Sequence, residues 1–152
     1  MLRATISKAS DLYSQARPEL VDNKKIIMAT KSALQKITHA ESTVDLARKC
    51  AVAADDKKAS DIVILDVSQI TSFADYFIVC SAPSERQVQA IVSNVEDVMR
   101  ESGLKPLGVE GLETCSWVLI DFGDFIFHCF TDAAREYYDL EGFWIDAPKI
   151  DF

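Results

Sequence analysis

Two pairs of aspartates are the first residues in this 152-residue chain whose types and spacing could carry out chemistry. Asp121 and Asp124 flank a Phe-Gly dipeptide, and Asp66 and Asp75 stand at the end of one apolar run and the start of the next. Two close carboxylates can hold a divalent metal or share a proton. Tight turns, however, favour Asp and Gly for conformational reasons alone. We therefore predict turn-forming or solvated roles for both pairs and no metal site.

The residue types that nucleophilic catalysis or phosphate binding would need are sparse. The two histidines are His39 and His128, and Cys129 beside His128 would point to the opposite face of a strand, so the two cannot form a dyad. None of the five glycines belongs to a Gly-rich phosphate-binding loop. The cysteines lack the paired spacing of a zinc site, and we expect buried free thiols at Cys50, Cys80, Cys115 and Cys129.

Aromatic residues near the C-terminus form a more promising group. They alternate with the acidic residues Glu136, Asp139 and Glu141, and they comprise Tyr137, Tyr138, Phe143 and Trp144, together with Trp117 from an earlier strand. Two interpretations remain open. An amphipathic helix that packs on its own sheet would explain part of the pattern, and a protein-binding surface would explain it equally well, because Trp and Tyr are enriched in binding hot spots.

The elements that would position these residues follow from hydrophobic periodicity and caps. Helices are predicted from Ser42 or Thr43 to about residue 55, from Ser84 to about Ser102, and from Thr131 or Asp132 to Tyr138. Apolar, β-branched runs predict strands over residues 61–67, 75–80, 115–121 and 124–130, with a short strand over 106–110 before a turn at Gly111. This order predicts a single α/β domain with a mixed sheet of about five strands flanked by helices, its first strands parallel through a crossover helix.

The last two long strands are expected to form a hairpin around Phe122-Gly123. A two-residue turn there would place Asp121 opposite Asp124 and Trp117 opposite His128. Alternation then puts Trp117, Leu119, Asp121 and their partners on one mixed face. The other face is apolar and should be core: Val118, Ile120, Phe125, Phe127 and Cys129.

Charge and composition exclude several classes of protein. No apolar run approaches the ~20 residues of a membrane span, and the formal net charge of −8 disfavours binding to nucleic acid. The charge is uneven, because residues 1–57 carry +3 and residues 58–152 carry −11. Such a surface attracts basic partners. The sequence favours a cytoplasmic location, with a mitochondrial one as the alternative, because the N-terminal segment contains Arg3, Lys8 and Arg17 but also Asp11, Glu19 and Asp22.

Six blocks of the chain resemble, in order, those of ribosomal silencing factors, also called Iojap-like proteins. They are residues 57–67 (KKASDIVILDV), 74–80 (ADYFIVC), 84–88 (SERQV), 109–111 (VEG), 117–124 (WVLIDFGD) and 135–141 (REYYDLE). The resemblance implies a nucleotidyltransferase-like topology, a homodimer and no enzymatic activity or cofactor. It also implies binding to the large ribosomal subunit through its ribosomal protein fourteen. Bound there, such a factor blocks subunit joining and lowers translation when nutrients are short.

Carried over residue by residue, the resemblance implies partner-binding roles for Trp117, Asp121, Asp124, Tyr138 and Glu141. Phe122 and Gly142 depart from the family pattern, which often has Tyr and Arg there, and this removes two contacts those side chains could make. We take Trp117 as the desolvated centre of the contact, rimmed by Asp121, Asp124 and Glu141. On that hypothesis Trp117→Ala costs about 2 kcal/mol or more of binding.

The resemblance also divides the chain and leaves two rivals. It predicts an extension of unknown role over residues 1–42, the silencing-factor domain over 43–147 and a tail over 148–152. One rival is an organelle factor for large-subunit assembly that uses the same contact surface. The other is a nucleotidyltransferase-like enzyme, which would need a Gly-Ser pair ahead of paired aspartates, and the stretch from Asp66 to Asp75 contains no Gly.

Overall fold

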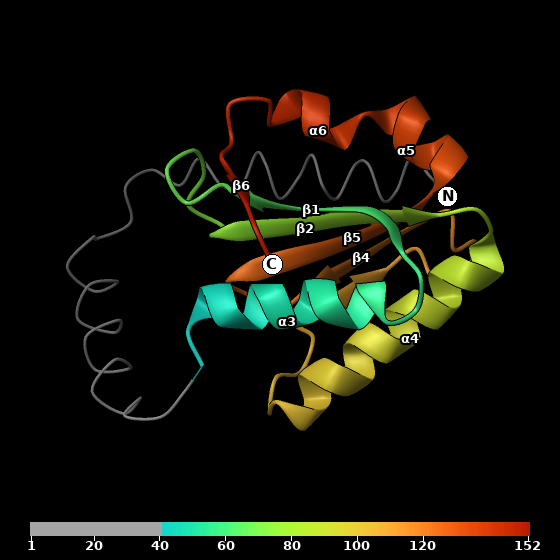
Figure 1. The fold of residues 1–152 in the computed structure, drawn as a ribbon, viewed down its shortest axis with the longest axis horizontal. Coiled ribbons are helices and arrows are strands. Elements are labelled where there is room, and N and C mark those ends of the chain that lie inside the picture. The colour runs from blue at the N-terminus through green and yellow to red at the C-terminus, as the bar shows by residue number, and fades with distance from the viewer. Residues whose placement is uncertain (1–40) are drawn as a thin grey trace.

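The computed structural model of the protein describes residues 41–152. Predictions that fall on residues 1–40, including those on His39, lie outside the described part. Figure 1 shows the order of the elements along the chain. They are α3 (Thr43–Asp55), β1 (Ser60–Asp66), β2 (Tyr76–Ala82), α4 (Glu85–Glu101), β3 (Gly108–Glu110), β4 (Trp117–Asp121), β5 (Phe125–Thr131), α5 (Asp132–Tyr138), α6 (Leu140–Phe143) and β6 (Lys149–Ile150).

The three predicted helices begin where their capping residues predict. Ser42 Oγ accepts a hydrogen bond from the Asp45 amide at 3.3 Å, and Ser84 Oγ accepts one from the Gln87 amide at 3.2 Å. Thr131 Oγ1 does the same for the Ala134 amide at 3.3 Å. Each bond satisfies a backbone N–H that the first turn of a helix leaves unpaired. The sequence therefore set the start of each of these helices correctly.

The sheet is mixed and has six strands in the order β3-β4-β5-β2-β1-β6. Only β2 and β5 pair in parallel, and the other four pairs are antiparallel. The predicted fold class is therefore confirmed. The short strand β6 pairs Lys149 and Ile150 with Leu65 and Ile64, and both residues lie in the segment 148–152 that the sequence predicts as a tail.

The prediction that the first two strands are parallel was wrong. β1 and β2 are antiparallel, with Asp66 opposite Tyr76 and Val63 opposite Val79. A parallel pair needs a long crossover, usually helical, whereas residues 67–75 form a short loop that suffices for an antiparallel pair. The crossover helix α4 belongs instead to the connection from β2 to β5, which also contains β3 and β4.

The β4–β5 hairpin exists, but its register differs by two residues from the predicted one. Asp121 lies opposite Ile126 and Trp117 opposite Phe130, and the Phe122 amide donates to the Phe125 carbonyl at 3.0 Å. The turn residues are Gly123 and Asp124, because Gly123 takes φ +92° at the first turn position. Side chains alternate with a period of two, so a shift of two leaves each predicted face intact. That prediction of faces is confirmed.

The helices cover the sheet as two layers, with α3 and α4 on one face and α5 and α6 on the other (Figure 1). The core under α3 and α4 contains the apolar hairpin face and the four cysteines, which are buried and free as predicted. Burial, the largest cause, raises the pKa values of the Cys50 and Cys115 thiols, so both stay protonated at neutral pH. The core under α5 and α6 is rich in aromatic rings.

Gly111, in the turn between β3 and β4, is at a position where the backbone requires glycine. Its φ is +85°, and a Cβ there would overlap the Trp117 carbonyl oxygen. Gly103 has a similar φ of +81° with open space around it. We expect Gly111→Ala to lower the free energy of unfolding by about 3 kcal/mol, against about 1 kcal/mol for Gly103→Ala. Urea unfolding measures both, and equal losses would show that the close approach to Trp117 is unimportant.

Candidate docking surface

The C-terminal helices take their place because of the way β5 ends. Thr131 is the last residue of β5 and the N-cap of α5, so the chain turns at once onto the face of the sheet opposite α3 and α4. Asp139 ends α5 in the left-handed conformation, with φ 44°, and α6 starts at Leu140. Leu140 and Trp144 are buried, and the Trp144 ring meets Phe77 edge-on at 5.0 Å. These two anchors hold α6 against the sheet.

Trp117 lies inside this second core and is 3% exposed. Its ring stacks on Phe130 at 4.8 Å and lies 5.1 Å from the Tyr138 ring. Its indole N–H donates to His128 Nδ1 at 3.1 Å. The sequence predicts this indole as the desolvated centre of a contact, and within the folded chain it is already desolvated beneath Tyr138 of α5. Of the predicted site residues, Trp117 and Tyr138 are in direct contact.

His128 is buried beside Trp117, and its neighbours explain its protonation state. Burial lowers the pKa of His128 from 6.5 to about 3. An indole N–H can only donate, so Nδ1 must be unprotonated to accept its hydrogen bond. The Phe77 ring meets the imidazole edge-on at 5.4 Å, and the imidazole is almost completely buried, so a charge on it would be poorly solvated. His128 is therefore a neutral structural residue in this core.

Glu141 is bound within the molecule by Arg135. The Arg135 guanidinium donates from Nε to Glu141 Oε1 at 2.9 Å, and its Nη2 lies 2.8 Å from the same oxygen. Its Nη1 donates to Ser81 Oγ at 3.3 Å and to the Ser60 carbonyl at 3.4 Å. Arg135 therefore joins α5 to α6 and to strands β1 and β2. Sequence reasoning missed Arg135 as a site residue, although its spacing of six from Glu141 was visible.

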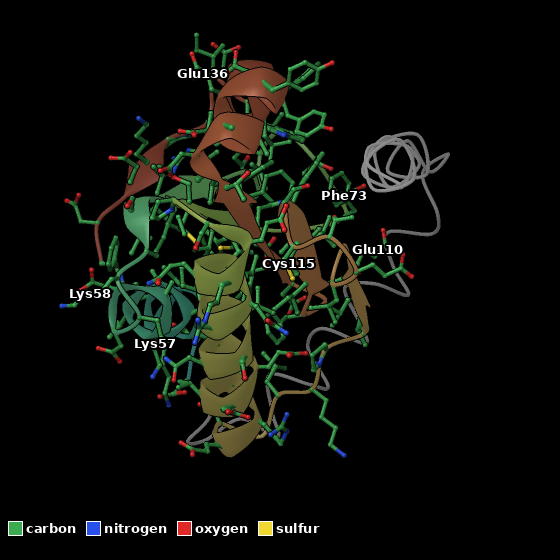
Figure 2. The ribbon with its side chains drawn as sticks, turned by 90° about the vertical axis from the view of Figure 1, so that its right-hand side faces the viewer. Lys57, Lys58, Phe73, Glu110, Cys115 and Glu136 are labelled. Carbon is green, nitrogen blue, oxygen red and sulfur yellow. The ribbon has the colours of Figure 1, made fainter. Side chains whose placement is uncertain are left out.

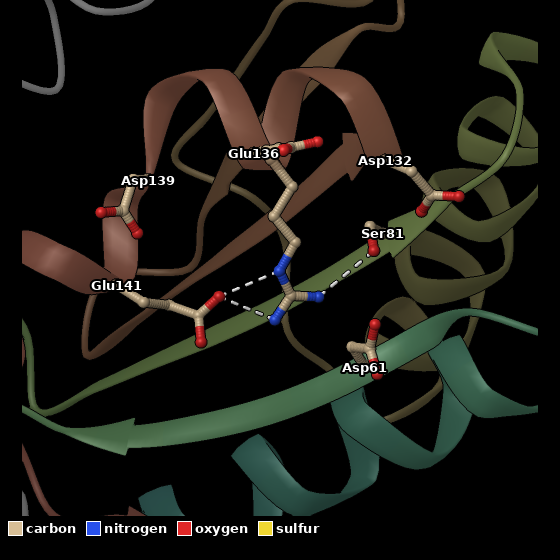
Figure 3. A pocket seen from close by; sticks show the side chains of 7 residues that line it. Asp61, Ser81, Asp132, Glu136, Asp139 and Glu141 are labelled. Atoms are coloured by element: carbon tan, nitrogen blue, oxygen red, sulfur yellow. Dashed lines mark hydrogen bonds and ion pairs between the residues drawn. The ribbon is translucent and has the colours of Figure 1, made fainter.

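A shallow pocket of about 300 Å³ opens around Arg135, and Figure 3 shows the side chains that line it. Five of the seven lining residues are acidic, and Arg135 is the only cation among them. The lining residues are Asp61, Ser81, Asp132, Arg135, Glu136, Asp139 and Glu141. Because Arg135 is engaged by Glu141 and Ser81, the pocket presents mainly carboxylates to its opening. Such a surface favours basic side chains.

The bridge between Arg135 and Glu141 can be compared with an exposed pair of equal length. The Arg135 and Glu141 side chains are 15% and 31% exposed, whereas Arg100 and Asp97, also 2.8 Å apart, are 63% and 59% exposed. We expect Arg135→Met to lower the free energy of unfolding by about 1–2 kcal/mol, because Glu141 and Ser81 lose a partner. Arg100→Met should cost no more than about 0.5 kcal/mol. Equal losses on urea unfolding would contradict a holding role for Arg135.

The two predicted aspartate pairs lie at the end of the sheet opposite the pocket around Arg135, and they act mainly in turns. Asp121 Oδ1 accepts from the Gly123 amide at 2.8 Å, and Asp66 Oδ1 accepts from the Ser68 amide at 3.0 Å. Asp75 is near both Asp124 and Asp66, and its pKa is raised first by burial and then by these two carboxylates. Within residues 41–152, no group of three or more His, Cys, Asp or Glu side chains is arranged to hold a metal.

The predicted site residues therefore form two groups. Trp117, Tyr138 and Glu141 belong to the layer of α5 and α6, whereas Asp121 lies four residues along β4 from Trp117, about 13 Å away, and Asp124 is in the turn beyond it. Three apolar side chains are strongly exposed near the first group, namely Tyr137 at 81%, Phe143 at 77% and Ile145 at 81%. The fold and surface define a class: a small mixed α/β domain with an acidic, partly apolar helical layer.

Comparisons with known proteins identify the family. The model of the family described as "Ribosomal silencing factor during starvation" matches residues 40–152. The chain is 45% identical over 101 residues to the ribosomal silencing factor of Bacillus subtilis, covering 66% of this chain and 86% of the relative. It is 42% identical over 110 residues to that of Halalkalibacterium halodurans, covering 72% and 94%. The chain belongs to the ribosomal silencing factor family.

Organelle proteins and solved structures agree with this assignment. The chloroplastic Iojap protein of Arabidopsis thaliana is 31% identical over 121 residues, covering 80% of this chain and 50% of that protein. A crystal structure of a Chromobacterium violaceum protein superposes with a TM-score of 0.68 at 36% identity, covering 74% of this chain and 92% of that one. Among the helices of residues 41–152, none is long and apolar enough to cross a membrane.

Proposed function

We propose that this chain binds the large ribosomal subunit through its ribosomal protein fourteen and prevents the small subunit from joining, so that translation falls when nutrients are limited. The observation that carries the proposal is family membership over residues 40–152. The net charge of −8 supports it, because an acidic protein is repelled by ribosomal RNA and attracted to a basic protein. In this proposal the chain acts in the cytoplasm as a homodimer and has no catalytic role.

The proposed contact uses the predicted residues in two ways. Tyr138 reaches the surface with Trp117 packed beneath it, and Glu141 holds α6 through Arg135. Asp121 and Asp124 supply negative charge at the hairpin end of the same sheet. Charges at the rim of a contact mainly raise the rate of association, while buried aromatic groups supply most of the affinity.

The test is a joining assay with purified full-length protein and separated ribosomal subunits. We expect the protein to sediment with the large subunit and to reduce the fraction of joined ribosomes. The variant Asp121→Asn/Asp124→Asn should associate several-fold more slowly at low salt, because an amide keeps the turn hydrogen bond but removes the charge. Asp55→Asn/Asp56→Asn is the matched control, since it removes two exposed charges beside α3. Unimpaired joining with excess wild-type protein would refute the proposal.

An organelle assembly factor is the second candidate. It is favoured by the mouse relative named "Mitochondrial assembly of ribosomal large subunit protein 1", which is 28% identical over 91 residues. The same assay separates the two functions. An assembly factor would bind immature large particles and leave the joining of mature subunits unchanged.

A further inference from the structure

The layer of α5 and α6 has a surface that nothing in residues 41–152 covers. Its three large exposed apolar side chains, Tyr137, Phe143 and Ile145, are each more than three quarters exposed. They lie among exposed carboxylates of the same segment. We call these exposed residues the α5–α6 surface: Asp132, Glu136, Tyr137, Asp139, Phe143, Ile145 and Asp146. Between residues 132 and 146 the only basic side chain is Arg135, which is bound to Glu141.

The first 40 residues of the chain have the complementary composition. They contain seven Lys and Arg against three Asp and Glu, a net charge of +4, whereas residues 41–152 carry −12. Lysines and large aliphatic residues alternate toward the end of this segment: Lys24, Lys25, Ile26, Ile27, Lys31, Leu34, Lys36 and Ile37. A basic and aliphatic segment is what an acidic and aromatic surface would bind. A second copy that presented its own α5–α6 surface would be a poorer occupant, because two such surfaces carry the same charge.

We propose that residues 1–40 dock on the α5–α6 surface of their own chain and thereby hide it from other partners. The docking is inferred from charge, exposure and connectivity in this chain. Its consequence rests on the proposed function, because a covered α5–α6 surface would lower the affinity for the large ribosomal subunit. The N-terminal segment is therefore an internal competitor that a basic ribosomal surface must displace.

Length and tethering both permit this docking. Lys24 and Lys25 precede the first residue of α3 by 18–19 positions, and an extended chain spans ~3.3 Å per residue, so they can reach ~60 Å. A folded unit of about 112 residues has a radius of gyration of ~13 Å, so the opposite helical layer lies within reach. A tethered segment also has an effective concentration of the order of millimolar, so even weak complementarity would keep the surface largely covered.

Hydrogen exchange of the full chain tests the docking without any ribosome. The test variant is Lys24→Glu/Lys25→Glu, and the control is Lys57→Glu/Lys58→Glu, which makes the same charge change in the turn after α3. Figure 2 shows Lys57 and Lys58 beside α3, far from Glu136 on α5. At low salt we expect amides of residues 132–146 to exchange several-fold faster in the test variant than in the wild type. High salt should remove that difference, and the control should exchange like the wild type.

Binding to large subunits then tests the consequence. The Lys24→Glu/Lys25→Glu variant should bind several-fold more tightly than the wild type and the control. If it binds more weakly, the segment contacts the ribosome and the proposal is wrong. If exchange at residues 132–146 is the same in all three proteins, the docking is wrong whatever the ribosome result. If none of the proteins binds subunits but the exchange difference is present, the docking stands and the proposed function fails.

Discussion

Replacing Trp117 with alanine is expected to lower the free energy of unfolding by about 3–5 kcal/mol, the range found when a large buried aromatic side chain is truncated. The indole is 3% exposed and stacks on Phe130 at 4.8 Å. Its loss would also leave His128 Nδ1 without the donor that lies 3.1 Å away. Urea unfolding followed by circular dichroism measures the change without depending on the tryptophan signal.

Tyr137→Ala is the matched control for this prediction. Tyr137 is an aromatic residue of the same face but is 81% exposed, so its truncation should change the free energy of unfolding by less than about 0.5 kcal/mol. A small effect of Trp117→Ala would mean that the second core does not depend on its indole. The comparison also changes how a binding defect of Trp117→Ala is interpreted, because lost folding would reduce binding without any direct contact. Trp117→Phe keeps a buried aromatic ring and removes the indole. A binding defect in this variant without a loss of folding would therefore come from a lost contact.

Acidification should destabilise the fold through His128. The pKa of this imidazole is about 3 in the folded protein and about 6.5 when exposed. Below pH 6.5 the unfolded chain therefore binds a proton that the folded protein excludes, and the stability present above pH 6.5 is lost as the pH falls. The slope approaches about 1.4 kcal/mol per pH unit, and the loss reaches about 4 kcal/mol near pH 3.

The contribution of His128 is isolated by comparison with His128→Gln, whose amide oxygen can still accept from the Trp117 indole. Between pH 7 and pH 4.5 the wild type should lose about 2–3 kcal/mol more of its free energy of unfolding than this variant loses. His39→Gln removes the other histidine and should leave the wild-type slope unchanged. If His128→Gln keeps that slope, the acid sensitivity arises elsewhere.

Most of the secondary structure could be predicted because its causes are local. Ser42 and Ser84 start helices through bonds to amides three residues away, and the β-branched runs of β1 and β2 are visible in the sequence. The pairing of the strands could not be predicted in the same way. The antiparallel pairing of β1 with β2 and the placement of β6 depend on which edges meet in space, and hydrophobic periodicity does not record that.

The candidate site shows the same division. The sequence alone established the family motifs, the two faces of the β4–β5 hairpin, the acidic character of the domain and the aromatic group near the C-terminus. Tertiary structure alone decided which aromatic residues face solvent, because α5 buries Trp117 and leaves Tyr137 exposed. It also brought Ser81 of β2 to Arg135 of α5, 54 residues apart. Burial and long-range contacts depend on how the layers pack, so local sequence patterns suggest the residues of a surface without determining which of them a partner can reach.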